Sequence, residues 1–359
     1  MILTNAKIVL EDKVINGSLE IEGDRITSVS EENRQGIDLD GAFLCPGFVD
    51  EHCHGSGEHW FFEEPKKAAE YHLKNGTTSL LCSMWRNAGR YSYEKAILNV
   101  KAAMGEDSNI RGVHMEGPYV DADLGSEGGE QYPCRREEYE HLIDISEGII
   151  KQWTFDPLQK GAMEFARCAR ENGIVLSVCY SKARPEELLP YMDLGLSVAG
   201  HMLCASGSAK PLFEGTKEPG SDVFTLVEDG MYAEVIADSM GAHVRPYYLK
   251  LIYKCKGADK IALVSDCCAG GETRGSDINL INGELYGSRL TLSVAIKNMQ
   301  KHINAPITDL VKMASTTPAR AMGLYGERGS IEAGKIADLA VLNDNLEVMK
   351  VFLSGKEVR

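Results

Sequence analysis

The stretch Cys45-Pro46-Gly47-Phe48-Val49-Asp50-Glu51-His52-Cys53-His54-Gly55 opens with a Pro-Gly turn, continues with apolar residues and then alternates two histidines with a cysteine. On a β-strand, residues i and i+2 point to the same face, so we expect His52 and His54 to project side by side from the end of a strand. This is the spacing of a pair of metal ligands. On its own this spacing is equally compatible with two unrelated histidines. Other residues of the chain must decide whether the two histidines bind a metal.

The composition is that of a globular protein, with 359 residues of which 43% are hydrophobic and 25% charged. This length allows one large α/β domain with a small appendage, or two ordinary domains. The formal net charge of −15 argues against a nucleic-acid partner and against an anionic membrane surface, because both require a basic face. The charge says little else about partners.

The ten cysteines are scattered and form no CxxC pair, so we interpret them as reduced thiols in the cytoplasm. The first residues lack a basic segment followed by a hydrophobic core, and no run of 18 apolar residues occurs. The sequence thus predicts a cytoplasmic protein without an export signal or a membrane span.

Both ends of the chain are predicted to form short strands. Turn residues separate apolar segments within residues 2–44, and similar segments follow Gly329. So few short strands cannot bury much core by themselves. We therefore expect residues 1–45 and 325–359 to build one small, discontinuous β-sandwich domain.

The middle of the chain, residues 46–324, alternates short apolar runs with amphipathic helical segments. Strands alternating with helices indicate a parallel sheet, and eight such units over this length are typical of a (β/α)8 TIM barrel. A doubly wound open sheet is the alternative. Against it, no GxGxxG follows an early strand and no GxxxxGK[ST] occurs. The runs predicted as strands are residues 48–51, 78–82, 110–115, 152–155, 174–178, 197–199, 232–236 and 260–264. The predicted helices are residues 65–75, 91–104, 158–172, 185–194, 247–256 and 292–302.

Ionisable residues stand at the ends of four of these predicted strands: His52, His54, Glu116, His201 and Asp266. In a (β/α)8 barrel, chemistry takes place at the carboxyl ends of the strands. Any one of these residues could be a cap or a core residue, but all five together are a nitrogen and oxygen ligand set suited to zinc, iron or manganese.

Several motifs carry a family resemblance. Besides the opening stretch they are Gly112-Val113-His114-Met115-Glu116-Gly117-Pro118-Tyr119, Leu263-Val264-Ser265-Asp266 and, in the tail, residues 314–324 and 329–339. On these motifs the chain resembles the amidohydrolase superfamily and, within it, is similar to the N-acetylglucosamine-6-phosphate deacetylase family, as a divergent member. The resemblance implies a metal-bearing (β/α)8 barrel with a small β domain.

The resemblance also implies an activity, the metal-dependent hydrolysis of an amide C–N bond. The expected reaction is deacetylation of N-acetylglucosamine 6-phosphate, or of a related N-acetyl amino sugar, to the amine plus acetate. The implied cofactor is one or two divalent ions, zinc first, with iron or manganese as alternatives. Glu116 matches the family's central metal-binding glutamate, His201 one of its histidine ligands and Asp266 its catalytic aspartate. His52 and His54 match a pair found in members that hold a second metal.

Some positions depart from the family pattern. Tyr180 stands where the other histidine ligand is expected, and a neutral phenol is a poor ligand. We therefore expect the metal to be held by His52, His54, Glu116 and Asp266. Gly128-Gly129-Glu130-Gln131 replaces a Gly-Ala-His that touches the substrate in the family, so the role of Gln131 stays open.

The phosphate-binding segments differ as well. Cys204 and Ala205 occupy a segment that has Asn-Ala in the family, and Lys217 replaces an arginine that reaches the neighbouring subunit's phosphate site, which makes a homodimer the expected state. Lysine keeps the charge but loses the bidentate geometry. His243 matches a histidine that contacts the substrate. Two alternatives remain: an amidohydrolase for a different amide, and a catalytically impaired metal-binding barrel.

Overall fold

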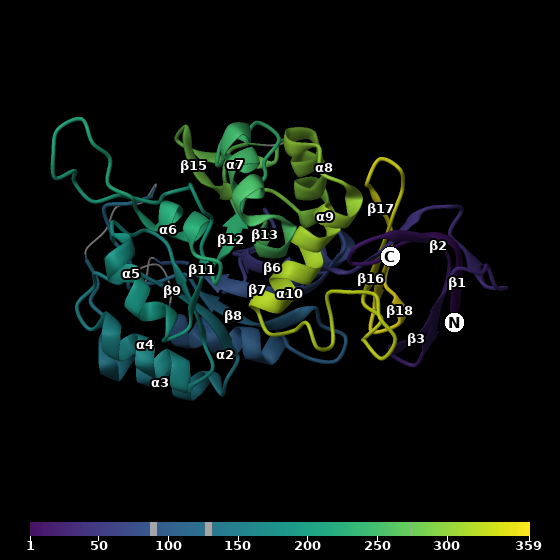
Figure 1. Ribbon diagram of the computed structural model, residues 1–359. Helices are drawn as coiled ribbons and strands as arrows, with labels where there is room; N and C mark the ends of the chain where they lie inside the picture. Colours follow the sequence, from purple (N-terminus) through teal and green to yellow (C-terminus); the bar gives the residue numbers. More distant parts are fainter. Residues whose placement is uncertain (87–91, 126–130, 274) are drawn as a thin grey trace.

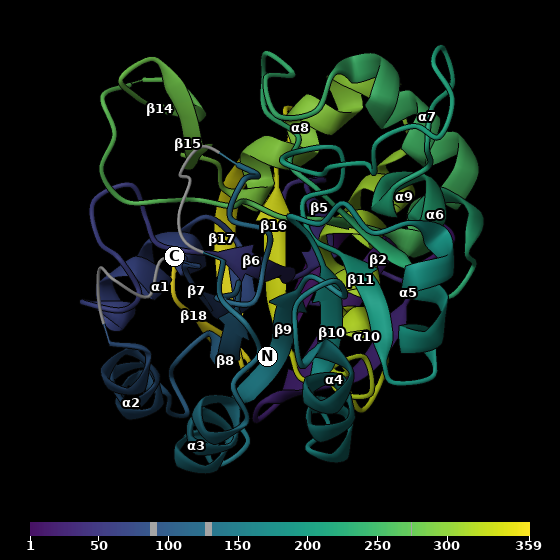
Figure 2. The ribbon, with the colours of Figure 1, turned by 90° about the vertical axis from the view of Figure 1, so that its left-hand side faces the viewer.

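The computed structural model describes residues 1–86, 92–125, 131–273 and 275–359, and its larger part is a ring of eight parallel strands covered by helices (Figures 1 and 2). All eight strands expected from the sequence are present, in chain order around the sheet, so the (β/α)8 barrel is confirmed. The barrel strands are β6 (Phe48–Cys53), β7 (Thr77–Met84), β8 (Ile110–Met115), β9 (Ile150–Phe155), β10 (Val175–Val178), β11 (Leu196–Ala199), β12 (Tyr232–Val235) and β13 (Ile261–Leu263).

The ring closes where the chain after β13 meets β6. Asp266 N donates to His52 O at 2.9 Å, and His54 N donates to Cys267 O at 2.9 Å. The Asp50 carboxylate reinforces this seam because it accepts the backbone N–H of Ser265 at 3.2 Å. The closure brings residue 266 next to the two histidines of the opening motif.

Helices surround the ring, and several begin at a proline, whose fixed φ suits the first turn of a helix. They are α1 (Pro65–Lys74), α2 (Tyr93–Ala103), α3 (Arg136–Ser146), α4 (Ala162–Glu171), α5 (Pro185–Met192), α6 (Ser221–Val227), α7 (Pro246–Lys256), η1 (Ala258–Lys260), α8 (Leu292–Ile303), α9 (Ile307–Val311), the π-helix η2 (Lys312–Thr316) and α10 (Thr317–Ala321). Among the described residues, none of these helices has the length and apolar character needed to cross a membrane.

The sequence prediction missed α3, α6 and the segment from α9 to α10. α3 is dominated by charged residues and buries Tyr139, Leu142 and Ser146, so its apolar stripe is narrow. α6 has only 7 residues, too few to show a helical period. The last segment is interrupted by a π-helical turn, which shifts the 3.6-residue repeat. The hairpin of β14 (Ile278–Ile281) and β15 (Glu284–Ser288) was also not predicted.

The small domain combines both ends of the chain, as expected, and lies on one side of the barrel (Figure 1). Its sheet curls until Arg25 forms an isolated bridge with Ile336, so the two layers of the predicted sandwich are parts of one curled sheet around a separate core. The strands are β1 (Ile2–Val9), β2 (Val14–Glu22), β3 (Arg25–Ser30), β4 (Ile37–Asp38), β5 (Phe43–Pro46), β16 (Leu339–Leu342), β17 (Val348–Leu353) and β18 (Lys356–Glu357).

On the amino-terminal side, a single glycine joins the two parts. Gly47 lies between β5 and β6, and a Cβ atom there would lie 2.1 Å from Thr78 Oγ1. Only glycine allows β5 to run into β6 so closely against β7. The small domain is thereby attached at the amino end of β6, which leaves the carboxyl ends of the barrel strands free for a site.

Candidate metal centre

The five residues predicted at the strand ends lie together and are buried. Their exposed fractions are 0% for His52, 3% for His54, 3% for Glu116, 2% for His201 and 8% for Asp266. They come from the ends of β6, β8, β11 and β13. Because the strands of the barrel are parallel, these ends meet at one rim, and the side chains converge there.

Glu116 lies between the two histidines of the opening motif. His52 Nε2 is 3.3 Å from Glu116 Oε1, and His54 Nε2 is 3.4 Å from Glu116 Oε2. Asp266 Oδ1 lies 3.3 Å from His54 Nε2 and 3.9 Å from His52 Nε2. One ligand atom each of His52, His54 and Glu116 falls within 4.8 Å of the others. The arrangement can hold a divalent cation between two imidazoles and one or two carboxylates.

The environment of His52 fits a metal ligand. Its Nδ1 lies 2.7 Å from Glu234 Oε2. Burial opposes the ionisation of Glu234, but His52 and Gln152 hold the pKa of this carboxyl below its usual value, so Nδ1–H donates to a carboxylate. Burial opposes a charge on the His52 ring, but without a metal Glu234 and Glu116 raise the pKa of this ring. Because Nδ1–H is committed to Glu234, Nε2 is the nitrogen that a cation would bind, and the cation would replace the proton on it. Nε2 is buried without a hydrogen-bond partner among the described residues and faces Glu116, as a ligand nitrogen would.

Tyr180 and His201 meet Glu116 on its other side. The Tyr180 hydroxyl is 3.0 Å from both Glu116 Oε1 and His201 Nε2, and His201 Nε2 is 3.0 Å from Glu116 Oε1. Burial and the Glu116 charge raise the pKa of Tyr180 well above its usual value. The phenol therefore stays protonated and donates a hydrogen bond within this triangle.

Both carboxyl groups of the centre are ionised. Burial opposes the charge of Glu116, yet His54, His201 and His52 hold its pKa well below the usual range. Burial likewise opposes the charge of Asp266, while the hydrogen bond from His54 and the charges of His52 and His54 lower its pKa. A deprotonated Asp266 can accept a proton.

A small pocket of about 40 Å³ opens above this centre. Aromatic rings form one wall, since Trp85 lies with its ring centroid 5.8 Å from His54 and 4.5 Å from Tyr286. The Arg86 guanidinium lies 4.4 Å from the centre of the Tyr180 ring. The lining residues are His54, Trp85, Arg86, Glu116, Tyr180, Asp266, Cys268 and Gly287.

Of the predicted substrate-binding residues, His243 lies nearest to this pocket. Its Nε2 donates to the carbonyl of Gly287 at 3.0 Å, and its Nδ1 is 3.1 Å from Asp238 Oδ2. His243 thus stands behind the wall formed by Gly287. Cys204 caps the ring of His201, because its carbonyl lies 2.9 Å from His201 Nδ1.

Three other predicted residues lie away from the pocket lining. Ala205, with φ +55°, belongs to the turn after β11, and Lys217 is exposed on the loop that follows. Gln131 donates to Asp121 Oδ1 at 2.9 Å. Residues 128–130, which precede it in the altered motif, lie outside the described part of the chain.

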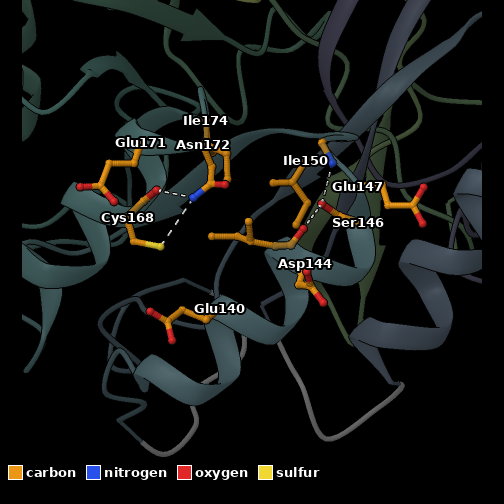
Figure 3. Close-up of a pocket in the computed structure, with 11 residues that line it drawn as sticks. Glu140, Asp144, Ser146, Glu147, Ile150, Cys168, Glu171, Asn172 and Ile174 are labelled. Carbon is orange, nitrogen blue, oxygen red and sulfur yellow. Dashed lines mark hydrogen bonds between the residues drawn. The ribbon is translucent and has the colours of Figure 1, made fainter.

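A roomier groove at the other end of the barrel is unrelated to this chemistry (Figure 3). It lies between α3 and α4, beside Ile150 and Ile174 at the amino ends of β9 and β10. Its lining includes the acidic side chains of Glu140, Asp144, Glu147 and Glu171 together with Cys168. It has no part in the metal centre, which occupies the opposite rim.

Comparisons with known proteins place relatives of this chain among the amidohydrolases. The amidohydrolase family model matches residues 252–358. The N-acetylglucosamine-6-phosphate deacetylase of Bacillus subtilis is 27% identical, covering 99% of this chain and 96% of its own. The enzyme of the same name from Lysinibacillus sphaericus is 27% identical over 90% of this chain and 88% of its own.

Solved structures extend the likeness to the fold. The N-acetylglucosamine-6-phosphate deacetylase of Thermotoga maritima has a TM-score of 0.84 at 28% identity, covering 100% of this chain and 99% of its own. That of Pasteurella multocida also has a TM-score of 0.84, at 26% identity over 99% of this chain and 98% of its own. The chain belongs to the amidohydrolase superfamily. Within it, the chain is a member of the N-acetylglucosamine-6-phosphate deacetylase family.

Sequence reasoning missed two parts of this amidohydrolase's centre. Glu234 orients His52 from across the barrel, whereas Asp50, two residues before His52, accepts backbone N–H groups. The signal for Glu234 was a charged residue inside an apolar strand. Cys268 was interpreted as an ordinary thiol, although it lines the pocket.

Proposed function

We propose that this amidohydrolase removes the acetyl group from an N-acetyl amino sugar 6-phosphate, with N-acetylglucosamine 6-phosphate as the first candidate. The observation that carries the proposal is the placement of Glu116 between His52 and His54, with Asp266 Oδ1 3.3 Å from His54 Nε2 at the same pocket. The kinship with deacetylases over nearly the whole chain supports the choice of substrate.

In the proposed mechanism His52, His54, Glu116 and Asp266 would hold a divalent cation. Such a cation lowers the pKa of a water molecule and polarises a carbonyl group. Asp266, ionised and facing the pocket, accepts the proton of the attacking water and delivers it to the departing nitrogen. One water is consumed, the C–N bond breaks, and the products are an amine and acetate.

Two residues position the side chains of the metal centre. Glu234 holds the ring of His52 so that Nε2 faces Glu116. The hydroxyl of Tyr180 lies beside Glu116 and His201, where another family member would have a metal ligand, and it donates a hydrogen bond instead. This supports a metal position nearer to His52 and His54. We propose zinc as the ion, because imidazole and carboxylate ligands in a buried site suit it.

We further propose a cytoplasmic homodimer with domains at residues 1–45 plus 325–359 and at residues 46–324. Leu212 and Phe213, each 73% exposed, lie on the loop that carries Lys217 and extends from the barrel (Figure 1). Two bulky apolar side chains on such a loop support burial against a second copy. All ten cysteines are free thiols, in keeping with a reducing compartment.

Metal analysis combined with a deacetylation assay tests the proposal. Protein from metal-supplemented medium is expected to hold at least one ion per chain and to release acetate from N-acetylglucosamine 6-phosphate. The 6-phosphate of N-acetylgalactosamine and unphosphorylated N-acetylglucosamine, assayed in parallel, define the sugar and the need for phosphate. Mere traces of metal together with no acetate from any of the three would overturn the proposal.

A further inference from the structure

Cys268 is held rigidly at the edge of the metal centre. Its N–H donates to Ser288 O at 3.0 Å, and Ser288 N–H in turn donates to Asp266 O at 2.8 Å. The hairpin of β14 and β15 therefore fixes residues 266–268 as one unit. Cys268 is 2% exposed and lines the same pocket as His54 and Asp266.

The neighbouring glycine makes room for the sulfur. Gly287 has a φ of +56°, and a Cβ atom at this position would lie 2.4 Å from Cys268 Sγ. Any other residue would push the sulfur away from its place in the pocket wall. In the described part of the chain Sγ makes one hydrogen bond, a long one of 3.7 Å to Asp266 O, so the thiol is not committed to a strong partner.

Three different ligand types meet here. One ligand atom each of His54, Asp266 and Cys268 lies within 4.8 Å of the other two, and all three residues are buried. His54 Nε2 and Asp266 Oδ1 are already 3.3 Å apart, the separation of two ligands on one small cation. An imidazole, a carboxylate and a thiol in one buried cluster form a typical zinc donor set.

We propose that Cys268 is a metal ligand and that, with His54 and Asp266, it binds a divalent cation that favours sulfur. Binding exchanges the Sγ–H proton for the cation, and the proton leaves to solvent. Thiolate prefers zinc or cobalt to magnesium or manganese. The inference rests on the proposed metal centre, with which it shares His54 and Asp266, and it extends that centre to the side away from Tyr180.

A second buried cluster that contains a thiol is an alternative site for the metal ion. Asp50, Cys53 and His72 also have ligand atoms within 4.8 Å of one another. The thiol and one imidazole nitrogen of this cluster are engaged with the backbone, since His72 Nε2 donates to Gly55 O at 2.7 Å and Cys53 Sγ lies 3.3 Å from the same oxygen. These three residues are also absent from the lining of the pocket, so we assign the metal to Cys268.

Cobalt reports directly on a sulfur ligand. The full-length protein, stripped with a chelator and reloaded with Co²⁺, is expected to show a thiolate-to-cobalt charge-transfer band in the near ultraviolet. Cys268→Ser should abolish the band and weaken cobalt binding at least ~10-fold, since losing even an outer partner of a ligand costs about 10–100-fold in affinity. Cys267→Ser, at the adjacent buried thiol, and Cys53→Ser should leave the band unchanged.

Each outcome decides a separate point. Stoichiometric cobalt without the band in the unmodified protein would overturn the role of Cys268 while leaving the proposed function intact. A band that survives Cys268→Ser, or that disappears in Cys53→Ser, would also overturn it. No bound cobalt at all would count against the proposed function itself. The first of these measurements needs no variant, so a folding defect in Cys268→Ser would not block the test.

Discussion

Glu234→Gln should weaken metal binding without unfolding the barrel. Glu234 Oε2 accepts from His52 Nδ1 at 2.7 Å and from His201 N at 3.2 Å, and Oε1 accepts from Gln152 Nε2 at 2.7 Å. Glutamine has the same shape and keeps one oxygen for His52 and His201, and its NH2 group can donate to Gln152 once the Gln152 amide turns its oxygen toward it. The substitution therefore removes the charge that orients His52 and strengthens it as a ligand, and little else.

The expected size of the effect follows from these contacts. A hydrogen bond to a charged group contributes about 1.5–3 kcal/mol, against about 0.5–1.5 kcal/mol for a neutral one. The difference, roughly 1–1.5 kcal/mol, corresponds to a metal affinity about tenfold weaker. Glu234→Ala is a poorer probe, because it would leave the three buried donors of His52, His201 and Gln152 without a partner, at ~1–3 kcal/mol each.

The assay is a competition titration of the metal-free protein with Zn²⁺ against a chromophoric chelator. Asp238→Asn is the matched control, because Asp238 Oδ2 also faces an imidazole nitrogen, His243 Nδ1, at 3.1 Å but outside the cluster of ligands. The control should keep the zinc affinity of the unmodified protein. An unchanged affinity in Glu234→Gln, or an equal loss in the control, would refute the assigned role of Glu234.

Three further predictions concern the centre and its surroundings. His52→Ala should abolish metal binding, measured as metal content per chain, and a variant with full metal content would contradict the ligand assignment. Tyr180→Phe should keep its metal, because the phenol is a hydrogen-bond donor here; loss of the metal would identify Tyr180 as a ligand. His72 is buried, and burial lowers its pKa to about 4. The unfolded chain therefore binds the extra proton first, and the free energy of unfolding of the metal-free protein should fall by up to about 1.4 kcal/mol per pH unit as the pH drops from about 6.5 to about 4. His72→Gln should show a shallower fall in urea titrations, and equal slopes would contradict a neutral His72.

Much of the architecture was available from local patterns. The alternation of apolar runs with amphipathic segments predicted all eight barrel strands, because burial on both faces leaves a continuous apolar signature in each strand. The same patterns placed His52, His54, Glu116, His201 and Asp266 at strand ends. The helices that escaped prediction lack such a signature, as α3 does with its narrow apolar stripe.

The opening motif shows what the sequence alone could and could not predict. Spacing alone determined that His52 and His54 share a face, since that depends on the two-residue repeat of a strand. Their partners were decided by the closing of the barrel, which brings Glu234, 182 residues away, to His52 Nδ1 and sets Cys268 beside His54. Burial and neighbouring charge, which also exist only in the folded chain, keep Tyr180 protonated and Glu116 ionised. The sequence thus named the ligand types, and the tertiary structure decided which atoms face one another and in which protonation state.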